Sequence, residues 1–173
     1  VNEFWNAISE LSEEQPDFKE NIEISLTGNI DQSIKESIKN NNLEENSMLN
    51  PFVPHKEATK LMNTSNLLLF IVPQAKRNSF IITGKLFEYI AINTPILSIG
   101  PKNGDASKIL SVAGRDPMLD YTDKEGMKCI IKKYFNLWKE NNQKTYKFQS
   151  SDFKKFSRYS ASKKISEILN EIS

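Results

Sequence analysis

Thr83, Gly84, Lys85 and Glu88 are the residues whose types and spacing best fit a binding site. The first three stand at the predicted start of a helix, where free backbone amides carry partial positive charge and suit a phosphate. The glycine lets a ligand approach the backbone closely, and the lysine adds a full positive charge. Glu88, one turn further along, can accept hydrogen bonds from sugar hydroxyls. The alternative is a solvated Lys85 and Glu88 pair on an ordinary surface helix.

The stretch that carries these residues, 82–100, has the sequence ITGKLFEYIAINTPILSIG. It predicts a helix followed at once by a buried parallel strand, because Asn93 suits a left-handed helix end, Pro95 prevents continuation, and residues 96–99 form an apolar run. The helix is expected to be mostly buried, since its apolar residues occupy a broad arc: Leu86, Phe87, Tyr89, Ile90 and Ala91.

This stretch resembles the group 1 glycosyltransferases, in the nucleotide-binding C-terminal half of their GT-B fold. The resemblance rests on residues 83–91 and 95–97, with support from Val53, Pro54, His55, Gly100, Asp105 and Ala106. It implies that Glu88 binds the ribose of a nucleotide sugar and that the backbone at Gly84 and Lys85 lies near the diphosphate. It also implies that the loop formed by Val53, Pro54 and His55 passes near the nucleotide base.

One position departs from the family pattern. Many members carry a second glutamate eight positions before the one that matches Glu88, and this chain has Phe80 there. The sugar contact made by that glutamate is therefore expected to be absent or made by another group.

The resemblance implies the donor-binding half of a retaining, metal-independent glycosyltransferase. Such an enzyme moves a sugar from a nucleotide diphosphate sugar to a glycan or lipid-linked acceptor, as in polysaccharide biosynthesis, and uses no further cofactor. We expect residues 1–173 to form a single Rossmann-like domain that lacks the N-terminal acceptor domain and the first strand of its own domain. On that expectation the chain alone transfers no sugar, and the sequence identifies neither the catalytic residues nor the acceptor.

The amino-acid composition limits the kinds of binding partner and the cellular compartment that we expect for this chain. The 173 residues include 23 basic and 22 acidic side chains, and this balance argues against nucleic acid as a partner. The single cysteine, Cys129, cannot form an internal disulfide and is expected to be buried in a helix, which favours the cytoplasm. Any association with a membrane would be peripheral, because the apolar run 67–73 is far shorter than the roughly 20 residues of a span. A lone histidine, His55, leaves no histidine-based metal site.

Strands and helices alternate along the chain, with strands predicted at 21–28, 48–53, 67–72, 96–99 and 117–121. This alternation predicts an α/β fold with a three-layer, Rossmann-like parallel sheet and helices on both faces. Without the first strand, the remaining five would take the flavodoxin-like order 2-1-3-4-5, with 67–72 beside 96–99. The long loop 73–82 carries Lys76 and Arg77, which we interpret as a solvated loop tip.

Two other functions remain open. A flavodoxin-like binding or regulatory module without transfer activity is favoured if side chains fill the space at Gly84. A protein-interaction module that docks through the last helix is favoured if its apolar stripe is exposed, namely Ala161, Ile165, Ile168, Leu169 and Ile172.

Overall fold

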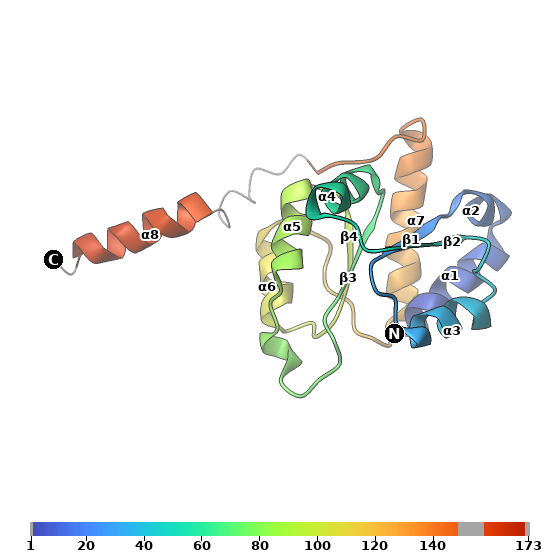
Figure 1. Cartoon of the computed structure of the whole chain (residues 1–173), viewed down its shortest axis with the longest axis horizontal. Coiled ribbons are helices and arrows are strands. Elements are labelled where there is room, and N and C mark those ends of the chain that lie inside the picture. The colour runs from blue at the N-terminus through green and yellow to red at the C-terminus, as the bar shows by residue number, and fades with distance from the viewer. Residues whose placement is uncertain (1, 149–157, 172–173) are drawn as a thin grey trace.

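The computed structural model describes residues 2–148 and 158–171 (Figure 1). Its strands are β1 (Ile24–Thr27), β2 (Ser47–Asn50), β3 (Leu68–Ile71) and β4 (Ile96–Ile99). Its helices are α1 (Asn2–Glu14), α2 (Pro16–Asn21), α3 (Gln32–Asn40), α4 (His55–Thr64), α5 (Gly84–Ile92), α6 (Asp105–Val112), α7 (Lys124–Glu140) and α8 (Arg158–Glu171), with the 3-10 turn η1 (Asn78–Phe80).

The strands form two separate parallel pairs rather than one sheet. β1 pairs with β2, and β3 pairs with β4. The predicted strand 117–121 is reduced to one parallel bridge between Leu119 and Ile99. The α/β class and the parallel pairing of β3 with β4 are therefore confirmed, but the predicted single five-stranded sheet is not what the described residues form, because β1 and β3 do not pair.

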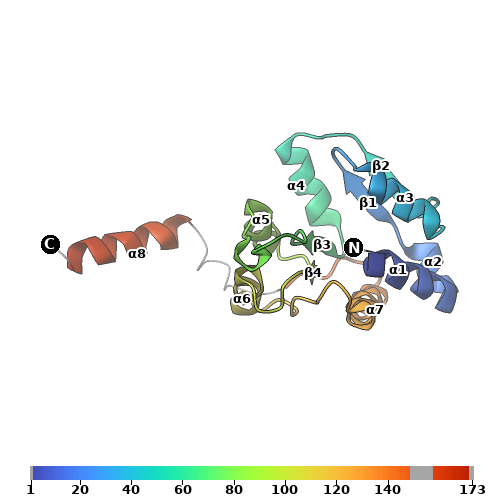
Figure 2. The same cartoon turned by 90° about the horizontal axis from the view of Figure 1, so that it is seen from below.

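A single helical layer extends beneath both strand pairs. Ile24 of β1 and Leu97 of β4 belong to the same buried cluster as Leu11 of α1 and Met127 of α7. Leu69 of β3 packs against this cluster as well. Figure 2 shows the interval between the two pairs with α4 on one side and α1 and α7 on the other. Packing on this layer holds β1 and β3 in place without pairing, which explains why the predicted order is not reached.

The opposite face of β3 and β4 is covered by α5 and α6. A second buried cluster joins Phe70 and Ile96 of the strands to Leu86 and Ile90 of α5 and Leu110 of α6. Successive strand residues point to opposite faces, so each of these two strands supplies both clusters. This half of the molecule therefore has helices on both faces of its strand pair, but the predicted three-layer, Rossmann-like sheet is not confirmed.

The sequence predicts a first helix that ends before Pro16 and then the strand 21–28, and the structure places the short helix α2 between them. Pro16 is its first residue, a position where the missing proline N–H has no helical partner to lose. Phe18 anchors this short helix in the core at 3% exposure. The predicted strand 21–28 is correspondingly shortened to β1.

For residues 54–63 the sequence predicts a helix that buries Ala58, Leu61 and Met62, and helix α4 differs most from expectation. The helix forms, yet none of its residues is buried, and Leu61 is 37% exposed. The physical reason is the interval between β1 and β3, which leaves α4 without a continuous sheet to pack on.

Helix ends follow local sequence signals closely. The sequence predicts Asp31 as a helix cap and Asn93 as a left-handed helix end. Asp31 caps α3 by accepting a hydrogen bond from the Ser33 amide at 2.8 Å, and Asn93 ends α5 with a φ of 61°, both as predicted. The sequence from Thr122 to Glu125 also predicts a capping box, but the cap lies one position later, since Asp123 caps α7 through the Gly126 amide at 3.0 Å.

Other expectations concern the later part of the chain. Cys129 is exposed on α7 rather than buried. On α8, Ile165 and Ile168 are exposed, while the side chains of Ala161 and Ile172 lie outside the described residues. None of the helices in the described ranges is long and apolar enough to cross a membrane.

Ion pairs border the contact between α1 and α7. Glu10 pairs with Lys124 and, at 3.0 Å, with Lys128, while Glu14 pairs with Lys128 and, at 3.1 Å, with Lys132. Hydrogen bonds from these lysines lower the pKa of both carboxyl groups, the strongest from Lys124 to Glu10 and from Lys128 to Glu14.

We predict an acid-dependent loss of stability from this network. A carboxyl group whose folded pKa lies below its unfolded value stabilises the fold above the unfolded pKa, about 4.3 for glutamate, and loses this contribution as pH falls through the folded value. The free energy of unfolding in urea should therefore fall more steeply from about pH 5 downward in the parent chain than in Glu10→Gln/Glu14→Gln. Glu13→Gln, on the same helix but outside the network, is the matched control. Parallel profiles for parent and double variant would contradict the prediction.

Candidate functional site

The amino end of α5 lies open at the surface. Thr83 holds the N-cap position in an extended conformation, but its side chain makes no capping hydrogen bond. The first amides of a helix have no partner within the helix, so those of Gly84 and Lys85 remain available to a ligand. A Cβ built on Gly84 would meet no atom within 4 Å. The space beside Gly84, where a side chain would lie, is therefore open.

Glu88 faces His55 across the contact between α5 and α4. The His55 Nε2 and Glu88 Oε1 atoms are 3.8 Å apart, and their side chains are 73% and 48% exposed. On the other side of the ring, His55 Nδ1 lies 3.1 Å from the Thr59 hydroxyl, which also donates to the His55 carbonyl at 2.9 Å. A 3.8 Å separation is too long for a direct hydrogen bond, so both atoms can still bind a polar group placed between them.

The base-contact loop predicted from the resemblance leads directly into this pair. Val53 is half-buried, Pro54 occupies the N-cap of α4, and His55 is the first residue of that helix. The structure thus brings His55 and Glu88 together, although they are 33 positions apart in the chain.

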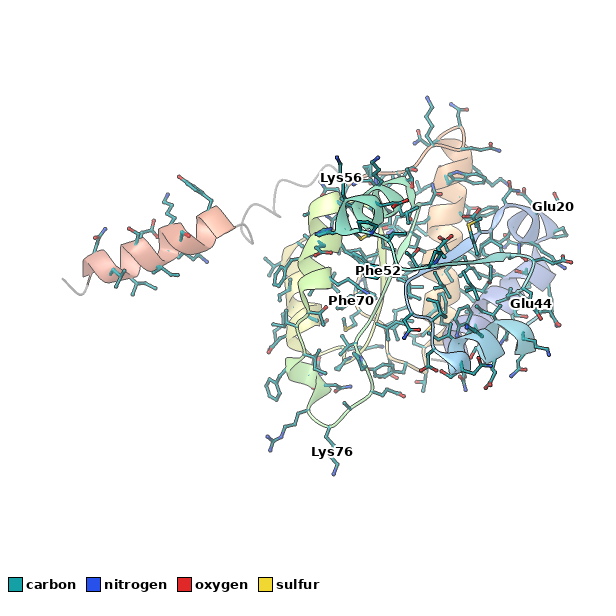
Figure 3. All side chains as sticks on the ribbon, viewed as in Figure 1. Glu20, Glu44, Phe52, Lys56, Phe70 and Lys76 are labelled. Carbon is teal, nitrogen blue, oxygen red and sulfur yellow. The ribbon has the colours of Figure 1, made fainter. Side chains whose placement is uncertain are left out.

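Lys76 and Arg77 do not join this pair. Both are exposed in the loop after β3, and Figure 3 shows Lys76 pointing away from the molecule. The loop itself is held in place, because Asn78 donates to the Tyr121 hydroxyl at 3.0 Å and Tyr121 donates to the Val72 carbonyl at 2.7 Å. These contacts agree with the interpretation of the two basic residues as a solvated loop tip.

Helix α5 is less buried than its apolar arc predicted. Only Leu86 and Ile90 are buried, and Phe87 is 36% exposed. Tyr89 is half-buried, and burial followed by the neighbouring charge of Glu88 raises the pKa of its hydroxyl. The expectation of a mostly buried helix is therefore wrong, because α5 packs on β3 and β4 through one narrow face.

The carboxyl end of α5, by contrast, is fixed by Arg115. Its Nη2 donates to the Ile90 carbonyl at 2.8 Å and to Asn93 Oδ1 at 2.7 Å, and its guanidinium lies 4.4 Å from the centre of the Phe148 ring. The Phe148 amide also donates to the Asn93 carbonyl at 2.8 Å. Arg115 was not predicted from the sequence, because nothing in its local sequence marks it as a buried residue that contacts a helix end.

The hollow on the surface of the molecule lies away from the predicted site residues. A shallow hollow that is open to solvent runs along α6, lined by Lys102, Asn103, Ser107 and Lys108 among others. Across residues 2–148 and 158–171, histidine, cysteine and acidic side chains nowhere gather in a group of three that could hold a metal ion.

Comparisons with protein-family models, curated proteins and solved structures give no match to this chain.

We predict that Glu88→Gln leaves the fold almost unchanged in stability. An exposed carboxylate 3.8 Å from an exposed imidazole contributes little, so the free energy of unfolding in urea should change by less than about 0.5 kcal/mol. Leu86→Ala, two residues away on the buried face, should cost about 2–5 kcal/mol by comparison. A loss above about 1 kcal/mol in Glu88→Gln would show that this carboxylate has a structural role.

Proposed function

We propose that this chain binds the nucleotide diphosphate sugar donor of a retaining glycosyltransferase of the GT-B type. One observation carries the proposal: His55 and Glu88 face each other 3.8 Å apart at the surface, one helical turn from the open amino end of α5. A nucleotide sugar needs acceptors for its ribose hydroxyls and, about one helical turn away, a site for its diphosphate anion. This surface offers both.

Each group has a chemical role in this proposal. The amides at Gly84 and Lys85, with the Lys85 ammonium, hold the diphosphate, while Glu88 accepts hydrogen bonds from the ribose and His55 lies toward the base. When the glycosidic bond breaks, negative charge develops on the departing diphosphate. Preorganised amides and a lysine stabilise that charge more than the ground state, so they would assist transfer without a metal ion.

The open space at Gly84 weighs against the flavodoxin-like alternative, which requires that region to be filled. The exposure of Ile165 and Ile168, at 59% and 57%, favours the interaction-module alternative, which can coexist with donor binding. Size-exclusion chromatography of Ile165→Asp/Ile168→Asp tests it for self-association. Loss of an oligomer seen in the parent would support docking through α8, and a monomeric parent would not.

Calorimetric titration with UDP, GDP and ADP, in the absence of metal ions, tests donor binding. At least one of the three should bind the parent chain. Glu88→Gln should then weaken that binding by about 1.5–3 kcal/mol, or roughly 10- to 150-fold, as expected for the loss of hydrogen bonds to a charged group. Glu57→Gln, an exposed glutamate in the first turn of α4, is the matched control and should bind normally. Equal affinities in all three proteins would remove Glu88 from the site.

The variant Gly84→Ala tests whether a ligand approaches the backbone closely at this position, because the substitution should change ligand affinity without lowering the stability of the fold. The added methyl group meets no atom of the protein, so the urea midpoint should stay the same or rise slightly. The same methyl group would occupy the position of a phosphate held against the backbone, and the affinity for the nucleoside diphosphate should fall at least tenfold. Unchanged affinity would mean that the phosphate binds elsewhere.

A further inference from the structure

Residues 144–148, called the strap below, join the carboxyl ends of α4 and α5. Asn142 and Gln143, both with positive φ, turn the chain after α7, and Figure 1 shows the segment running from there toward α4 and α5. At its far end the Phe148 amide donates to the Asn93 carbonyl at 2.8 Å. The strap therefore contacts both of the helices that carry the candidate site.

Helix α4 buries none of its residues, so packing of side chains does little to fix its position. The last carbonyl groups of a helix also have no partner within it. In α4 three of them accept hydrogen bonds from other parts of the chain: Met62 from the Thr94 hydroxyl at 3.3 Å, Asn63 from the Lys147 ammonium at 2.7 Å, and Thr64 from the Thr145 hydroxyl at 3.4 Å. Two of these three donors belong to the strap.

Lys147 makes the charged contact among the three. Its ammonium also donates to the hydroxyl of Thr94, a fully buried residue just after the end of α5. Positive charge at this point complements the negative partial charge at the carboxyl end of α4. Burial lowers the pKa of Lys147, so holding the charge here costs free energy that these hydrogen bonds offset. Lys147 and Thr94 thus form one polar junction between the strap, α4 and α5.

The junction lies at one end of α4, and His55 is the first residue at the other end. At about 1.5 Å per residue His55 lies about 14 Å from Thr64 along the helix, so a tilt of about 10° would move it by about 2 Å. The His55 and Glu88 side chains are 3.8 Å apart, a separation at which one polar group can bind both. A shift of that size would remove this arrangement.

We propose that Lys147 is a positioning residue, which holds His55 opposite Glu88 by capping the carboxyl end of α4. The strap also fixes α5 through Asn93, so one segment places both members of the pair. The consequence for ligand binding rests on the donor site proposed above. The positioning itself is measured without a nucleotide, so a chain that binds no nucleoside diphosphate would refute the donor site and leave this proposal to its own test.

The test uses Lys147→Met, which removes the ammonium and keeps a side chain of similar length. His55 is the only histidine, so its ring protons are assigned without ambiguity by NMR. The nuclear Overhauser effect between this ring and the Glu88 methylene protons should be present in the parent chain. In Lys147→Met it should fall at least about twofold, because the end of α4 loses a hydrogen bond from a charged group. Lys144→Met, which replaces an exposed lysine of the same strap, is the matched control and should keep the signal.

Amide hydrogen exchange separates positioning from a general effect on stability. In Lys147→Met the amides in the last turn of α4 should exchange about tenfold faster or more, while those of α7 exchange as in the parent chain. Thr94→Val, which removes the hydroxyl of the junction at nearly constant volume, should have the same two effects. Thr94→Ser, which keeps the hydroxyl, should have neither.

Three results would overturn the proposal. The first is a parent chain without the signal between His55 and Glu88. The second is a signal of parental strength in both Lys147→Met and Thr94→Val. The third is exchange in α7 that accelerates as much as exchange in α4, since Lys147 would then stabilise the whole fold and would not position one helix.

Discussion

The packing of α1 on α7 is the contact on which the rest of the molecule depends. Two-stranded sheets are marginally stable alone, and these two do not pair with each other. Leu11 and Met127, both fully buried, lie in the one cluster that reaches both pairs. Burying each such side chain is worth about 1.5–3 kcal/mol. The ion pairs around the contact contribute less, because Glu10 and Glu14 remain 38% and 45% exposed to solvent that screens their charges. The apolar contact therefore holds the halves together, and the ion pairs around it mainly set its response to pH.

Sequence patterns predicted the parts of the fold that local signals determine. The apolar run 96–99 forms β4, and Asp31 and Asn93 mark helix ends because each acts on its own backbone neighbourhood. The division of the strands into two separate pairs could not be predicted in this way, since it depends on how the helical layer spaces β1 and β3. The exposure of α4 follows from the same cause: its sequence is amphipathic, but its apolar face needs a neighbour that the local pattern does not specify.

The candidate site was predictable by residue type but not by geometry. Gly84, Lys85 and Glu88 stand out because they are close in sequence on one helix. The meeting of Glu88 with His55 depends on the crossing of α4 and α5, which no spacing rule provides. Gly84, Lys85, Glu88 and His55 are exposed at the surface and do not line a deep cleft. Their side chains therefore contribute little to the stability of the fold.

Helix α5 is held firmly at one end and left open at the other, and this asymmetry matters for ligand binding. Arg115 donates to the last turn and to Asn93, which places positive charge where the helix dipole is negative. Burial lowers the pKa of Arg115, but an arginine starts so high that it stays charged at neutral pH. Because the carboxyl end is already neutralised and fixed, an anion at Gly84 would meet a positioned helix end and would not have to order it. Less conformational entropy is then lost on binding, which increases the affinity obtained from the same few contacts.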